Sequence, residues 1–177
     1  MTEIFRQLLK KRGVSDDFLR PQYRPEFYAD LPDLDKAVER IKRAVEQDEK
    51  ILIYGDYDAD GVTASSVMLA GLKLLGAKHV EVMLPDRFKD GYGMGARVVE
   101  RAKQDGVQLV VTVDCGSNNA EVVAELGRLG VEVVVTDHHE ISGELPAAVA
   151  VVNPKRSDFK GDELRELAGV GDRRAHV

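Results

Sequence analysis

Three carboxylates stand at alternate positions in one short segment of the sequence. The segment 55–61, GDYDADG, contains Asp56, Asp58 and Asp60, and it lies between an apolar run and a stretch with helical spacing. Carboxylates this close together repel one another unless a cation lies among them, and Mg²⁺ and Mn²⁺ prefer oxygen ligands. The spacing therefore predicts a divalent metal site. A helix capped by Asp60, with solvated neighbours, is the structural alternative.

Further metal-binding side chains follow two other apolar runs. Asp114 comes directly after the run 109–113, and His138 and His139 follow the run 131–135 closely. Taken singly, the aspartate is typical of a cap and the histidines of an ordinary loop. Carboxyl ends of parallel strands share one edge of a sheet, so we expect all these groups to converge. A mixed set of oxygen and nitrogen ligands suits Mn²⁺ better than Mg²⁺ or Ca²⁺.

The segment 85–93, PDRFKDGYG, has the composition of a phosphate-binding loop. Gly91 and Gly93 permit close approach of the backbone, Arg87 supplies positive charge, and Tyr92 offers a stacking face or a hydroxyl. An ordinary turn accounts for the same residues equally well.

The elements that must position these residues alternate between strands and helices. Apolar runs at 51–54, 80–84, 109–113, 131–135 and 149–152 predict strands, and the spacing at 34–47, 62–75, 94–103 and 120–129 predicts helices. Several runs are dominated by valine, as expected for strands covered on both faces. The pattern predicts an α/β fold with a parallel five-stranded sheet flanked by helices.

Residues 1–33 are expected to form a small preface, with a helix at 2–12 followed by a proline-containing linker. Residues 34–171 form the α/β domain in this interpretation, and the polar residues 172–177 are a tail that does not suit such a domain.

Composition narrows the functions open to the chain. The 177 residues include 25 Lys and Arg against 31 Asp and Glu, a net charge of −6, which argues against a generally basic nucleic-acid-binding domain. Cys115 is the single cysteine, so neither an internal disulfide nor a cysteine-based zinc or redox site is expected. No apolar run approaches the roughly 18 residues of a membrane span, and no signal peptide is evident, so we expect a cytoplasmic protein.

Taken together, these motifs resemble the DHH phosphoesterase family, most closely its RecJ-type branch of single-strand-specific 5′→3′ DNA exonucleases. The resemblance covers about residues 5–171. It rests on the segments 53–63, 113–116 and 136–139, and also on Arg87 with the segments 91–93, 152–155 and 167–171. It implies a Rossmann-like domain and metal-dependent phosphodiester hydrolysis in DNA repair and recombination.

The resemblance also implies roles for individual residues. The metal ligands of a two-cation Mn²⁺ or Mg²⁺ site would be Asp58, Asp60, Asp114 and His138. Asp56 and His139 would support catalysis, with His139 near the scissile phosphate. The strand would be held by Arg87, Gly91, Tyr92 and Gly93. Single-stranded DNA, a helicase and a single-strand-binding protein are the implied partners, and no membrane is involved.

Members of this family carry a fourth aspartate motif and a second, glycine-rich domain, which this sequence lacks. We therefore expect a truncated fragment with impaired activity. Alternatives are a phosphodiesterase acting on short oligonucleotides, cyclic dinucleotides or 3′-phosphoadenosine 5′-phosphate, a non-catalytic replication-associated binding module, or a non-functional remnant.

Overall fold

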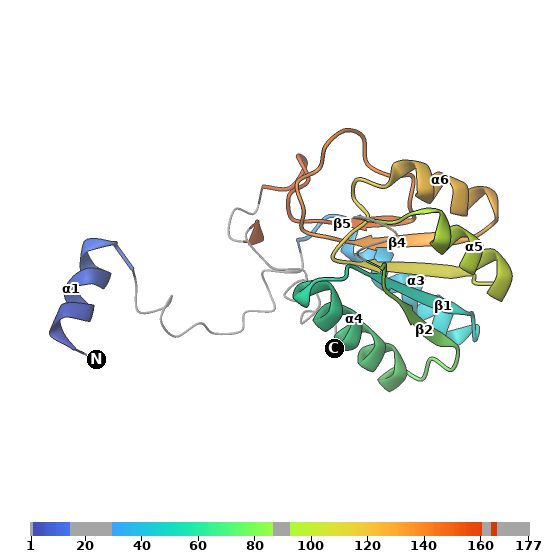
Figure 1. The fold of residues 1–177 in the computed structure, drawn as a ribbon, viewed down its shortest axis with the longest axis horizontal. Coiled ribbons are helices and arrows are strands. Elements are labelled where there is room, and N and C mark those ends of the chain that lie inside the picture. The colour runs from blue at the N-terminus through green and yellow to red at the C-terminus, as the bar shows by residue number, and fades with distance from the viewer. Residues whose placement is uncertain (1, 15–29, 87–92, 161–163, 166–177) are drawn as a thin grey trace.

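The computed structural model describes residues 2–14, 30–86, 93–160 and 164–165. The fold is a parallel five-stranded sheet with helices on both faces (Figure 1), which confirms the predicted fold class. In chain order the elements are α1 (Glu3–Lys11), α3 (Leu34–Glu46), β1 (Ile51–Gly55), α4 (Ala59–Leu74), β2 (Val80–Met83), α5 (Ala96–Asp105), β3 (Leu109–Val113), α6 (Ala120–Arg128), β4 (Glu132–Thr136) and β5 (Ala150–Val152).

The strand order is β2-β1-β3-β4-β5, and every neighbouring pair is parallel. The chain leaves β1 toward β2 and returns to the other side of β1 to form β3. In open sheets of this kind, ligands bind beyond the carboxyl ends of the strands where the order reverses. The order therefore points to the ends of β1 and β3 as the binding edge.

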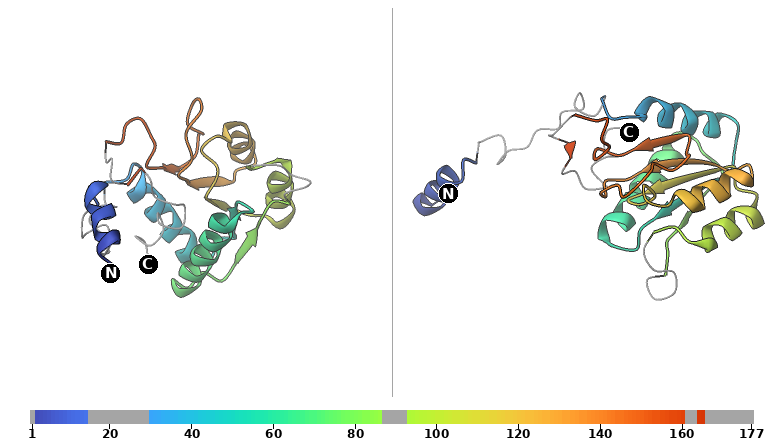
Figure 2. Two further views of the ribbon diagram at one scale, coloured as in Figure 1. Left: turned by 60° about the vertical axis from the view of Figure 1, so that its left-hand side comes forward. Right: turned by 90° about the horizontal axis from the view of Figure 1, so that it is seen from above.

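Two apolar layers cover the sheet. Ile51 and Ile53 of β1 face α3 and α4, whereas Leu52 and Tyr54 face α5 and α6, because successive side chains of a strand point to opposite faces. Figure 2 shows the two helix pairs on opposite sides of the sheet. β1 and β3 are buried along their whole length, which explains their near-continuous apolar sequences.

The start of α3 is tied to the last strand by Asp33. This residue has a left-handed backbone with φ of 58°, and its carboxylate accepts hydrogen bonds from Arg156 Nη1 at 2.6 Å and from the Val151 amide at 3.3 Å. Lys36 donates to the same carboxylate at 2.6 Å. The contact holds one flanking helix against the edge of the sheet that carries β5.

The boundaries of the elements differ slightly from the predicted ones. The helix predicted at 62–75 is α4, which begins at Ala59, because Asp58 caps it by accepting a hydrogen bond from the Gly61 amide at 2.9 Å. The cap is therefore Asp58 and not Asp60. The predicted helix at 2–12 is present as α1, and none of the residues of this helix is buried.

Among the described residues, no helix combines the length and the apolar character that crossing a membrane requires. The predicted domain boundaries at 33 and 171 remain an interpretation, and the 172–177 tail lies outside the described residues.

Candidate metal centre

The loop after β1 brings its aspartates close to one another through a glycine. Asp56 is 3% exposed and accepts a hydrogen bond from the Tyr57 amide at 2.7 Å. A Cβ on Gly61 would lie 2.4 Å from the carbonyl oxygen of Asp56, so only glycine lets the first turn of α4 approach this backbone. The close approach keeps Asp58, the cap of α4, beside Asp56.

Asp114 provides the most buried carboxylate of this edge. Its side chain is 1% exposed, and neither carboxylate oxygen accepts a hydrogen bond of acceptable geometry from the described residues. Burial raises its pKa, although His138 beside it acts in the opposite direction. A buried carboxylate is costly unless a positive charge compensates it. The position therefore fits a metal ligand.

The backbone at Asp114 is also unusual, since its φ of 62° lies in the left-handed region. Its amide donates to the Thr136 carbonyl of β4 at 3.0 Å, which holds the turn after β3 against the neighbouring strand. Left-handed conformations of residues other than glycine cluster at functional sites. The turn aims the side chain across the sheet edge toward β4.

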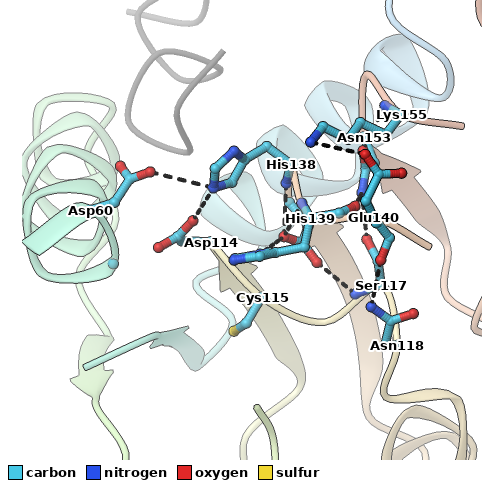
Figure 3. Close-up of polar contacts among 12 residues, drawn as sticks. Asp60, Asp114, Cys115, Ser117, Asn118, His138, His139, Glu140, Asn153 and Lys155 are labelled. Atoms are coloured by element: carbon cyan, nitrogen blue, oxygen red, sulfur yellow. Dashed lines mark hydrogen bonds and ion pairs between the residues drawn. The ribbon is translucent and has the colours of Figure 1, made fainter. Parts of the chain in front are cut away.

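His138 lies between two of the aspartates (Figure 3). Its Nε2 is 2.9 Å from Oδ1 of Asp114 and 3.5 Å from Oδ2 of Asp60, so the first turn of α4 and the segment after β3 meet at this ring. The contact with Asp114 raises the pKa of the imidazole, with burial opposing the shift. A cation bound here would require a neutral imidazole and ionised carboxylates as its ligands.

His139 is oriented by Asp137, a residue whose role the sequence did not reveal. Asp137 Oδ1 accepts hydrogen bonds from the backbone amides of both histidines, at 2.7 and 3.1 Å, and lies 2.8 Å from His139 Nδ1. Its Oδ2 accepts from the Ser117 amide at 2.9 Å. Burial opposes ionisation of Asp137, but these hydrogen bonds outweigh it and lower its pKa. Asp137 thus fixes both the His139 ring and the backbone of the loop that carries the two histidines.

The side chains form two overlapping groups with metal-ligand spacing. One ligand atom each from Asp56, Asp58 and Asp114 lie within 4.8 Å of one another, and so do those from Asp114, His138 and His139. Asp114 belongs to both groups. A carboxylate common to both groups is compatible with a site for two neighbouring cations.

A second network supports the backbone of the histidine loop. Its central residue, Asn153, lies in the segment 152–155 that contributes to the family resemblance, but the sequence predicts no role for it. The Asn153 side chain is fully buried, and its Nδ2 donates to Ser117 Oγ at 2.8 Å and to the His139 carbonyl at 3.1 Å. Asn118 donates to the Glu140 carbonyl at 2.8 Å and accepts from the Ser142 amide at 2.7 Å. No periodic pattern reports such contacts, because each joins loops that are far apart in the sequence.

The structure therefore brings together Asp56, Asp58, Asp60, Asp114, His138 and His139, as predicted. Of the predicted substrate-binding loop, Gly93 is buried and its carbonyl accepts a hydrogen bond from the Tyr54 hydroxyl at 3.0 Å. Arg87, Gly91 and Tyr92 lie outside the described residues. The catalytic and binding roles of all these residues stay predictions.

A family model and individual relatives agree on the family to which this chain is similar. Residues 50–171 match the DHH family, N-terminal domain. The chain is 42% identical over 178 residues to the single-stranded-DNA-specific exonuclease RecJ of Bacillus subtilis (strain 168), covering 97% of this chain and 22% of the relative. It is 36% identical over 170 residues to the exonuclease of the same name from Escherichia coli (strain K12), covering 95% of this chain and 29% of the relative.

Solved structures agree with these sequence matches. A crystal structure of exonuclease RecJ bound to manganese superposes with a TM-score of 0.70 and 36% identity, covering 80% of this chain and 35% of that one. RecJ of Thermus thermophilus in complex with Mg²⁺ superposes with a TM-score of 0.54 and 26% identity, covering 92% of this chain and 18% of that one. The chain thus spans well under half the length of the relatives that it matches.

Proposed function

Because the chain belongs to the DHH family, we propose that it carries the metal-binding domain of a nuclease that hydrolyses single-stranded DNA from the 5′ end. The relatives from B. subtilis and E. coli are single-stranded-DNA-specific exonucleases. The observation that carries the proposal is Asp114, a buried carboxylate that lies 2.9 Å from the His138 ring nitrogen, at an edge shared with other acidic and histidine side chains.

The ligand atoms present fit Mn²⁺ or Mg²⁺. Asp58, Asp60, Asp114 and His138 would hold the metal, with Asp114 common to both positions of a two-cation site. Carboxylate oxygens suit both ions, and the imidazole nitrogen favours Mn²⁺. When bound, such ions lower the pKa of a coordinated water and neutralise charge on the phosphate oxygens of an in-line displacement.

The remaining residues of the site would position the reacting groups. Asp56 adds a further carboxylate to the cluster, directly after β1, and accepts a hydrogen bond from the Tyr57 amide that keeps the loop in place. His139, held through Nδ1 by Asp137, would meet the scissile phosphate or the leaving oxygen. A fixed ring of this kind needs no reorganisation when the substrate arrives.

The substrate strand would be held near its 5′ end by Arg87, Gly91, Tyr92 and Gly93. Residues 1–33 would form a preface, 34–171 the DHH domain and 172–177 a tail. A role in DNA repair and recombination in the cytoplasm, beside a helicase and a single-strand-binding protein, belongs to the same proposal.

The test is a cleavage assay with Mn²⁺ and a single-stranded oligonucleotide that carries a radioactive 5′-phosphate. The parent chain is expected to release labelled mononucleotide, and Asp114→Asn is expected to release none. A duplex of the same sequence should be left intact. Equal cleavage by both proteins would refute hydrolysis at this site. No cleavage by the parent at saturating Mn²⁺ would favour an inactive fragment or a non-catalytic binding module, and cleavage of a cyclic dinucleotide instead would reassign the substrate.

A further inference from the structure

We propose that Lys155 binds a phosphate group of the substrate strand beside the metal centre and that Glu140 competes for the same ammonium group. The inference rests on the proposed function and adds a substrate contact to it. It starts from the position of Lys155, which follows the end of β5 and reaches Glu140, the residue directly after His139 (Figure 3).

Two contacts hold Lys155 at the histidine loop. Its backbone amide donates to Asn153 Oδ1 at 2.8 Å, while Nδ2 of the same asparagine donates to the His139 carbonyl at 3.1 Å. Its Nζ lies 3.1 Å from Glu140 Oε1. One fully buried amide side chain therefore links the backbone of Lys155 to that of His139, and the ammonium group meets Glu140, the next residue along the histidine loop.

The negative charge of the aspartates at this edge repels a nucleic acid strand, and a positively charged side chain nearby would offset the repulsion. Five aspartates gather at this edge, and a nucleic acid strand brings one negative charge with each phosphate. Arg156, the next residue, is already engaged by Asp33, by Asp158 and by the Val151 carbonyl. Within the part of the chain that the structure describes, Lys155 has one ion-pair partner, Glu140, whose carboxylate extends into solvent.

The ion pair between Lys155 and Glu140 can be replaced by a contact between Lys155 and a phosphate group. The Lys155 side chain is 18% exposed, whereas that of Glu140 is 79% exposed. Ion pairs that involve an exposed carboxylate contribute little to stability, so a phosphate oxygen can displace Glu140 at low cost. The largely buried lysine stem loses little conformational freedom on binding, because the folded protein has already restricted it.

The experiment measures binding separately from cleavage. A fluorescein-labelled, phosphorothioate-linked single-stranded oligonucleotide is titrated with the full chain in Mn²⁺, and anisotropy is followed over a series of salt concentrations. The variants are Lys155→Ala, Lys155→Arg and Glu140→Gln. The controls are Lys78→Ala and Asp48→Asn, because Lys78 and Asp48 form an exposed ion pair at 2.7 Å, at the amino ends of β2 and β1.

Lys155→Ala is expected to weaken binding about tenfold and to reduce the slope of log K against log salt by about 0.7, the value for one phosphate contact on a single strand. Lys155→Arg should retain most of the affinity, and Glu140→Gln should tighten binding more than Asp48→Asn does. Lys78→Ala should bind as the parent does, and kcat should change less than KM in Lys155→Ala.

Three results would overturn the inference. If Lys155→Ala binds the oligonucleotide as the parent does, Lys155 does not contact the substrate strand. If Glu140→Gln binds more weakly than the parent, the ion pair stabilises the loop and does not compete with the substrate. A loss of Mn²⁺ affinity in Lys155→Ala, measured by calorimetry, would assign the effect to the metal centre. If the parent chain binds no oligonucleotide, the proposed function fails as well, which separates that outcome from the first three.

Discussion

His138 Nε2 lies 2.9 Å from Asp114 Oδ1, so the loops after β4 and β3 meet across two neighbouring strands. Both atoms are metal ligands by chemical type, and neither Asp114 oxygen accepts a hydrogen bond from the part of the chain that the structure describes. Burial makes the Asp114 carboxylate costly in the metal-free protein, and a cation bound between these two side chains would compensate its charge.

Replacing Asp114 should therefore raise the stability of the metal-free protein and weaken its binding of metal. In the absence of metal, Asp114→Asn is expected to increase the free energy of unfolding by about 1 kcal/mol, because a neutral amide is buried at lower cost than a carboxylate. Asparagine also tolerates the left-handed backbone. Urea unfolding without and with Mn²⁺ measures both effects.

In the parent, Mn²⁺ at about 100 times its dissociation constant should add about 2.7 kcal/mol to the free energy of unfolding. The variant should gain almost nothing. A metal-free variant that is less stable than the parent would contradict this account of the buried carboxylate.

Gly61→Ala should destabilise the fold by about 2 kcal/mol, because the added Cβ would overlap the backbone of Asp56. Gly127→Ala in α6 is the matched control. Its Cβ would meet nothing within 4 Å, and alanine favours a helix over glycine by up to about 1 kcal/mol, so this variant should be slightly stabilised. Urea denaturation measures whether each substitution lowers or raises the free energy of unfolding.

Asp33 should make stability depend on pH at the acidic end. Burial alone would raise its pKa, but hydrogen bonds from Lys36 and Arg156 outweigh burial and lower it from 3.8. A carboxylate with a lowered pKa in the folded state stabilises the protein above the pKa of the unfolded chain, and this contribution is lost as pH falls through the folded pKa.

Asp33→Asn, which retains the left-handed backbone at this position, should lower the free energy of unfolding by about 1 kcal/mol near neutral pH. The difference from the parent should shrink below pH 3.8. Urea unfolding across this range measures it, and a difference that is constant with pH would contradict the role of the charge.

Asp137→Asn should disturb the metal centre without removing a proposed ligand. The amide nitrogen would face the Ser117 amide, two donors in conflict, and the support for His139 Nδ1 would weaken. Mn²⁺ affinity is expected to fall about tenfold, as is typical when a residue that orients ligands is replaced. Calorimetric titration measures this, with Asp158→Asn, an exposed partner of Arg156, as the control. Equal affinities in the two variants would refute the role of Asp137.

The sequence predicted the sheet and the metal-binding side chains because both leave local signals. Valine-rich runs indicate buried strands, and aspartates or histidines directly after them indicate the shared edge, which is where Asp58, Asp114 and His138 lie. The apolar spacing that predicts α4 begins at Val62, three residues after the helix starts at Ala59, because the cap at Asp58 begins the helix.

Other features depend on contacts between distant segments and leave no such signal. Asn153 joins two loops through one amide, and Gly61 is required by the backbone of Asp56, which a sequence pattern cannot report. The left-handed backbone of Asp33 likewise follows from its bonds to β5 and to Arg156.

The connection from β4 to β5, residues 137–149, contains no helix, unlike the other connections of the sheet. The histidines of the site therefore lie on a segment held mainly by side-chain hydrogen bonds, such as those of Asn118 and Asn153. Such a segment can open locally without unfolding the sheet, whereas β3 at the centre opens only with the whole domain. Amide hydrogen exchange should thus be faster in this connection than in β3, and a bound metal ion should slow it selectively.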